Sequence, residues 1–139
     1  MSNPEHTAEA RRWFKYARED LASAEAMLAQ QLGVPRQVCW LAQQAADKAL
    51  KAVLIDLGIE FPRTHDLDVL RTLLPADSPV KDHLPDLAEL GEWAVEARYP
   101  GDWPEATRDD ATLAVSLGGQ VVLAAASHLA AKGLRWGDL

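Results

Sequence analysis

The most regular alternation of apolar and polar positions lies between Pro35 and Gly58. Apolar side chains recur there at steps of three and four residues, which places them on one face of a helix. They are Val38, Leu41, Ala42, Ala45, Ala49, Ala52, Val53 and Leu57. Proline suits a first helical turn, and glycine suits the left-handed residue that closes a last turn. The pattern therefore predicts a central helix over residues 35–57.

Similar periodicity predicts four further helices, over residues 7–31, 65–74, 79–99 and 104–132. The first is capped by Thr7 or a neighbouring residue, and a break at Gly33 turns the chain into the antiparallel central helix. Thr64 and Asp66 are alternative caps for the short third helix. We predict an all-α fold, an up-and-down four-helix bundle with one additional short helix, in a single domain over residues 1–139.

The last predicted helix contains adjacent glycines, Gly118 and Gly119. A glycine inside a helix costs up to about 1 kcal/mol relative to alanine, so we expect another helix to approach closely at this point. That neighbour is either the central helix or a twofold-related copy. The predicted inner stripe of the same helix consists of Leu113, Leu117, Val121, Ala124 and His128.

A single cysteine, Cys39, lies within the central helix, so we expect a buried thiol and no disulfide framework. No run approaches the ~20 apolar residues that a membrane span requires. The N-terminus also lacks a basic and then apolar leader. These features predict a cytoplasmic protein that does not insert in a membrane.

Charge is unevenly distributed along the chain, which carries a formal net charge of −7. Up to Arg63, eight acidic residues match eight lysines and arginines, whereas from Thr64 onward thirteen acidic residues face six basic ones. Nonspecific binding of nucleic acid depends on a broad basic face that neutralises phosphates. We therefore expect none, and any contact with a nucleotide should be confined to a local pocket.

The central helix has a polar edge, on which Gln44, Lys48 and Lys51 share a face and Asp47 precedes Lys51 by four residues. One interpretation is a solvated flank with a salt bridge worth about 0.2 to 0.5 kcal/mol. The other is a binding edge for a phosphate-bearing or nucleobase-like ligand, because lysine supplies charge and glutamine supplies donors and acceptors.

His65 and Asp66 follow one another after the central helix. Such a pair can belong to a metal-dependent phosphohydrolase site, but that site needs further ligands from other helices. His6, His83 and His128 do not have a familiar ligand spacing. We therefore predict no metal and no cofactor, and we expect His65 to hold its loop through side-chain hydrogen bonds.

Three segments occur in a characteristic order: Gln-Gln-Ala-Ala-Asp-Lys-Ala-Leu-Lys at 43–51, Phe-Pro-Arg-Thr-His-Asp-Leu at 61–67 and Ala-Arg-Tyr-Pro at 97–100. Together they resemble the HEPN domain family, named for its occurrence in higher eukaryotes and prokaryotes in nucleotide-binding proteins. The resemblance spans roughly Ala10 to Leu129. It implies an all-helical up-and-down bundle that commonly forms homodimers with a cleft near the dimer axis.

Many members of that family are ribonucleases, with an arginine followed after four to six residues by a histidine. Arg98 matches the arginine, but Trp103, Pro104 and Glu105 stand at the histidine positions. The resemblance therefore implies that no catalytic residue is present, since the group that would move a proton is missing. A ribonuclease with an atypical site, in which Tyr99 or Glu105 substitutes, is the alternative.

The Ala-Arg-Tyr-Pro form looks like another branch, similar to the helical substrate-binding half of nucleotidyltransferases. Small members of that branch often work with a minimal nucleotidyltransferase, in some cases as toxin and antitoxin. This implies a homodimeric, non-catalytic protein that binds a nucleotide or substrate beside such a partner. A helical interaction scaffold is a further alternative. The residues implied for the binding groove are Gln44, Lys48, Lys51, His65, Arg98 and Tyr99.

Overall fold

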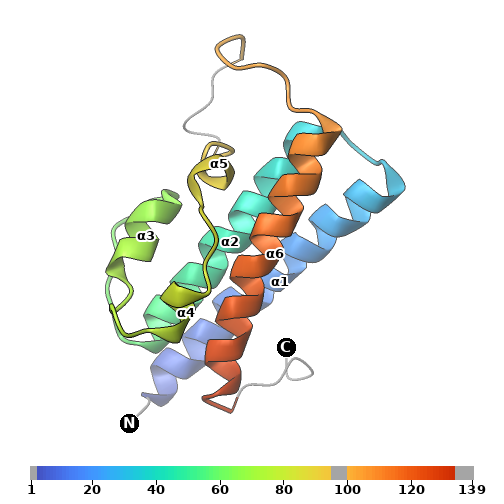
Figure 1. The fold of residues 1–139 in the computed structure, drawn as a ribbon. Coiled ribbons are helices and arrows are strands. Elements are labelled where there is room, and N and C mark those ends of the chain that lie inside the picture. The colour runs from blue at the N-terminus through green and yellow to red at the C-terminus, as the bar shows by residue number, and fades with distance from the viewer. Residues whose placement is uncertain (1–2, 95–99, 134–139) are drawn as a thin grey trace.

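Three long helices form the frame of the fold: α1 (Pro4–Gln30), α2 (Pro35–Asp56) and α6 (Arg108–Ala130) (Figure 1). The described part of the connection from α2 to α6 contains the shorter helices α3 (Leu67–Leu73), α4 (Pro79–Asp82) and α5 (Ala88–Gly91). The structure, a computed structural model, describes residues 3–94 and 100–133, and these ranges contain no strand. The predicted all-α class is confirmed.

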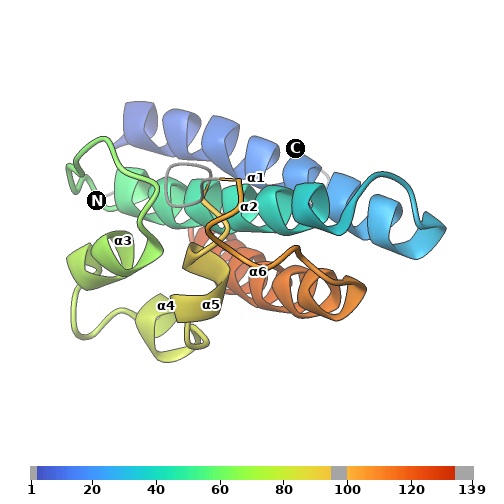
Figure 2. The same cartoon turned by 90° about the horizontal axis from the view of Figure 1, so that it is seen from above.

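Helix α2 lies at the centre, with α1 on one side and α6 and the short helices on the other (Figure 2). Helix α1 runs antiparallel to α2. Helix α6 runs parallel to α2, because Gly118 lies against Ala42 while His128, later in α6, contacts Asp56, later in α2. The chain must therefore return along the bundle between α2 and α6. The segment with α4 and α5 makes this return, and the up-and-down order is kept.

The continuous helix predicted over residues 79–99 is wrong, because residues 83–87 between α4 and α5 are not helical and α5 ends at Gly91. Residues 95–99 of that prediction lie outside the described residues. Pro85 explains the break, since proline lacks an N–H group and disfavours helical geometry in the residue before it. Arg71 Nη1 donates a hydrogen bond of 3.0 Å to the Pro85 carbonyl, and Asp86 Oδ1 accepts one from the Ala88 backbone. These contacts hold the break and start α5.

Capping side chains set the helix ends that the sequence placed differently. Helix α1 begins at Pro4, earlier than predicted, because the Asn3 side chain accepts a hydrogen bond from the Glu5 backbone. Asp66, one of the two predicted caps, caps α3.

Helix α6 begins at Arg108 and not at residue 104, because Thr107 and Asp110 form a reciprocal capping box. Helix α2 ends within one residue of its predicted end, and Gly58 has the expected positive φ of 71°.

The core is built around α2, whose alanines allow its neighbours to approach closely. The predicted apolar stripe is buried or packed against the core, and Cys39 is buried as expected. The inner stripe predicted for α6 is wrong at Leu113, which faces outward. Residues that pack inward from α6 are Ala111, Ala114, Gly118, Val121, Val122, Ala124, Ala125 and Leu129.

The two central glycines of α6 have different surroundings. A Cβ atom on Gly118 would lie 2.9 Å from the carbonyl oxygen of Ala42, whereas one on Gly119 would meet open space. The close approach predicted at these glycines therefore occurs at Gly118, and the neighbour is α2, the predicted central helix.

By length and composition alone, α6 is long and apolar enough to cross a membrane. No segment with these properties was expected from the sequence. Less than half of its most apolar window is buried inside the bundle. The apolar character has a structural use nonetheless, because the inward face of α6 packs against α2.

Candidate ligand-binding site

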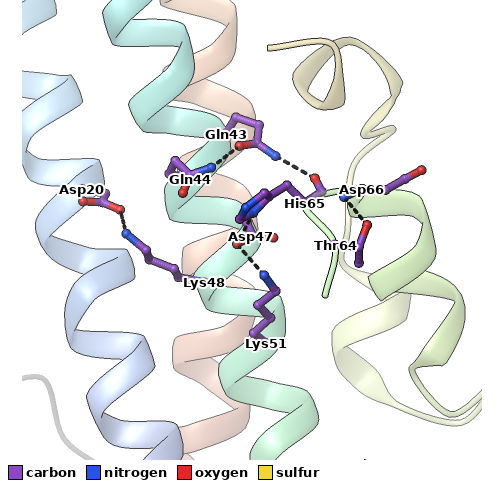
Figure 3. A network of polar contacts seen from close by, with 9 residues as sticks. All are labelled: Asp20, Gln43, Gln44, Asp47, Lys48, Lys51, Thr64, His65 and Asp66. Atoms are coloured by element: carbon purple, nitrogen blue, oxygen red, sulfur yellow. Dashed lines mark hydrogen bonds and ion pairs between the residues drawn. The ribbon is translucent and has the colours of Figure 1, made fainter. Parts of the chain in front are cut away.

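Asp47 is the centre of the polar network shown in Figure 3. Its side chain is only 2% exposed, and its Oδ2 atom lies 3.0 Å from Lys51 Nζ and 3.4 Å from His65 Nδ1. Lys51 is on α2 with Asp47, while His65 comes from the loop before α3. One buried carboxylate oxygen therefore joins a helix cation to an imidazole on a separate segment.

A second contact fastens the same loop to α2. Gln43 Nε2 donates a hydrogen bond of 2.9 Å to the backbone oxygen of His65, and Gln43 Oε1 accepts one from Gln44 Nε2 (Figure 3). The loop is shaped further by Thr64, whose hydroxyl accepts a hydrogen bond from the Asp66 backbone. The loop position of His65 is thus fixed through both its side chain and its backbone, which confirms the expected hydrogen-bonding role.

Aromatic side chains cover the ammonium group of Lys51. Lys51 Nζ lies 5.7 Å from the centre of the Trp13 ring and 5.8 Å from that of Phe61, within the range of cation–π attraction. Trp13 is anchored by a hydrogen bond of 3.0 Å from Nε1 to Glu9. Hydrogen bonds from Arg12 and from Trp13 lower the pKa of Glu9, which keeps this acceptor ionised.

Lys48 and Gln44 do not join Lys51 and His65. Lys48 Nζ makes an ion pair of 2.5 Å with Asp20 of α1, and both side chains are about a quarter exposed (Figure 3). Gln44 is bonded to its neighbour Gln43. The polar edge of α2 therefore contacts two different elements. Lys48 pairs with α1, whereas Gln43 and Asp47 contact the 63–66 loop.

Lys51 and His65 line a cleft of about 870 Å³ beside α5. We call it the His65 cleft and define it by Lys51, Arg63, His65, Asp66, Asp68 and Glu92. The side chain of His65 is 40% exposed, and Arg63 is exposed at the rim. The cleft thus presents protonatable and cationic groups together with carboxylates.

Arg98 and Tyr99, the other two predicted site residues, lie outside the described residues. Lys51 and His65 are the predicted residues that the structure brings together.

Sequence reasoning missed Arg63, although Arg63 stands two residues before His65 in the motif. It also treated Asp47 as a partner of Lys51 on the helix surface. His65 of the 63–66 loop contacts Asp47, and Trp13 of α1 covers its partner Lys51, so the surroundings of this carboxylate come from other parts of the chain.

The His65 cleft can hold a small ligand that carries both an anionic group and hydrogen-bond donors. Arg63 and His65 can bind a phosphate, and the carboxylates of Asp68 and Glu92 can accept hydrogen bonds from hydroxyl or amino groups. The same carboxylates oppose an extended polyanion. The cleft therefore combines groups that can bind an anion with groups that accept hydrogen bonds.

Solved structures support the architecture. TT1696 from Thermus thermophilus is 27% identical with a TM-score of 0.69, covering 84% of this chain and 94% of that chain. ST0689, described as an archaeal HEPN homologue, shares the fold with a TM-score of 0.65 at 24% identity, over 86% of this chain and 97% of that one. No curated protein matches this chain. The HEPN domain model matches residues 10–128, and the chain therefore belongs to the HEPN domain family.

Proposed function

We propose that this HEPN protein binds a nucleotide or a similar phosphate-bearing ligand in the His65 cleft and does not itself catalyse a reaction. The observation that carries the proposal is the gathering of Lys51, Arg63 and His65 at one cleft, above the buried Asp47 carboxylate. Asp47 orients His65, so a ligand meets an imidazole that is already positioned. The ammonium of Lys51 is paired with Asp47 and only 7% exposed, so it adds positive charge to the cleft wall. Preorganised donors of this kind bind with a smaller entropic cost.

Arg63→Ala should weaken nucleotide binding by about 10- to 100-fold, because one hydrogen bond to a charged group is worth roughly 1.5–3 kcal/mol. Isothermal titration calorimetry with nucleoside mono-, di- and triphosphates measures the change. Lys15→Ala removes the same charge from the exposed surface of α1 and should leave the affinity unaltered. Equal affinity of Arg63→Ala and wild type, or no heat with any nucleotide, would contradict the proposal.

The proposed role further includes a partner of the minimal nucleotidyltransferase class, which would supply the catalytic carboxylates and the metal. Support comes from the Ala-Arg-Tyr-Pro segment at 97–100 and from the absence of histidine in the sequence between His83 and His128. Purification of the tagged protein from its own cells, followed by mass spectrometry, tests for this partner. RNA cleavage that is metal-independent and lost in Arg98→Ala would instead favour the atypical ribonuclease.

We also propose a homodimer that uses the outward face of α6. This face carries Leu113, Ser116, Gln120, Leu123 and Ser127, which are all exposed and uncharged. A twofold interface brings each surface against itself, so a face without charge avoids repulsion between like groups. Leu123 is 62% exposed and would be covered in such a pair.

Leu123→Glu should convert this dimer to a monomer. Covering a leucine is worth about 1.5–3 kcal/mol, so placing a carboxylate there should weaken association by about tenfold or more. Light scattering coupled to size exclusion reads the mass directly. Tyr16→Glu, at an exposed aromatic of α1, should remain dimeric. A wild-type monomer, or an unchanged mass for Leu123→Glu, would refute this arrangement.

A further inference from the structure

Three of the five tryptophans line a single cavity of about 900 Å³. Trp40 comes from α2, Trp93 follows α5, and Trp103 lies in the loop before α6. These residues are far apart in the sequence, and the fold brings them to the end of the bundle where α2 begins. The volume is in the range of pockets that enclose small organic ligands.

Polar side chains complete the cavity, which we call the tryptophan pocket and define by Trp40, Trp93, Trp103, Arg36, Gln37 and Glu105. Arg36 and Gln37 belong to the first turn of α2. Glu105 is contributed by the same loop as Trp103. The pocket therefore combines flat aromatic surfaces with a cation, an amide and a carboxylate.

Flat indole rings attract flat heteroaromatic ligands by stacking, and this attraction tolerates different bases. Trp40 and Trp103 are 37% and 41% exposed, and both line the cavity, so they are within reach of a ligand. An aromatic cage can also hold an organic cation. The pocket also contains both charges: Arg36 can pair with an anionic group on a ligand, and Glu105 can accept a hydrogen bond from an amino group.

The remaining polar groups suit the edge of a nucleobase. A glutamine amide can pair with a ring nitrogen and an exocyclic amino group together, and a glutamate accepts a hydrogen bond from such an amino group. Gln37 and Glu105 supply these two functions at the same cavity. Bases with an exocyclic amino group, such as adenine, fit this set best.

We infer that the tryptophan pocket is a nucleotide site that stacks the base against its indoles and places the phosphate near Arg36. The site is distinct from the His65 cleft, because the residues that line the two cavities do not overlap. The inference goes beyond the proposed function and does not depend on binding in that cleft.

Titration of AMP into the Arg63→Ala variant tests the site with the His65 cleft weakened. Intrinsic tryptophan fluorescence reports contact with the indoles, and calorimetry gives the affinity independently of the fluorophores. Trp103→Ala, a change at an exposed loop position, should weaken AMP binding by at least about fivefold, the lower end for loss of one stacking partner. Tyr16→Ala, an exposed aromatic outside the pocket, should bind AMP as its parent does.

Adenosine carries the same base as AMP but no phosphate, so comparing the two ligands separates the contribution of the base from that of the phosphate. Arg36→Ala should weaken binding of AMP and leave binding of adenosine unchanged. The inference is overturned if neither AMP nor adenosine produces heat or quenching at millimolar concentration, or if Trp103→Ala binds AMP as tightly as its parent. Arg36 and Trp103 do not line the His65 cleft, so a loss caused by their replacement reports on the tryptophan pocket. The test of the cleft itself compares Arg63→Ala with wild type.

Discussion

Asp47→Ala is expected to lower the free energy of unfolding by about 3–5 kcal/mol, the usual cost of breaking a buried ion pair on one side. The change leaves the ammonium of Lys51, only 7% exposed, without its carboxylate and removes the side-chain contact that fastens His65. Since domains are commonly stable by only about 5–15 kcal/mol, this is a large fraction of the total. Urea denaturation followed by circular dichroism measures it.

Two further variants separate charge burial from the general loss of a carboxylate. Asp20→Ala removes the partner of Lys48, where both side chains are partly exposed, and should cost no more than about 1 kcal/mol. Replacing the whole buried pair, as in Asp47→Ala with Lys51→Met, should recover most of the lost stability because no buried charge remains. Similar costs for Asp47→Ala and Asp20→Ala would show that Asp47 does not hold the network.

Gly118→Ala and Gly119→Ala are expected to change stability in opposite directions. A methyl group on Gly118 would press against the Ala42 carbonyl at 2.9 Å, and forcing α2 and α6 apart should cost about 1–3 kcal/mol even after the gain in helix propensity. A methyl group on Gly119 meets open space and should stabilise the protein by up to about 1 kcal/mol.

Thermal and urea unfolding of both variants provide the comparison, and each serves as the control for the other. The same helix, the same substitution and neighbouring positions make the difference specific to the contact with α2. Stabilisation by Gly118→Ala would mean that the two helices do not approach as closely as described.

Local chemistry was sufficient to predict the parts of the fold that depend on it. Pro35 and Gly58 bounded α2 correctly, because both act on their own turn of backbone. The same kind of signal was overlooked at Pro85, which divides the predicted helix over 79–99, and at Thr107 with Asp110, which start α6 later than Pro104 suggests. These differences concern boundaries and continuity, and the class of fold is unaffected.

The candidate site was less predictable, because side chains on one helix face choose partners from different elements. Lys48 and Lys51 are three residues apart, yet one pairs with Asp20 of α1 and the other with a carboxylate buried beneath the 63–66 loop. Helical spacing predicts that Lys48 and Lys51 share an edge of α2, but it does not predict which other element packs against each lysine. Arg63 and the three tryptophans of the tryptophan pocket became candidates only once distant segments were seen side by side.

The central claim, that a phosphate-bearing ligand enters the His65 cleft, is tested most directly by nuclear magnetic resonance of the ¹⁵N-labelled protein during nucleotide titration. The account predicts saturable shifts of the backbone amides of residues 63–68, which line or flank the cleft, with little change around Asp20 and Lys48. An unshifted 63–68 loop at saturating nucleotide would contradict it.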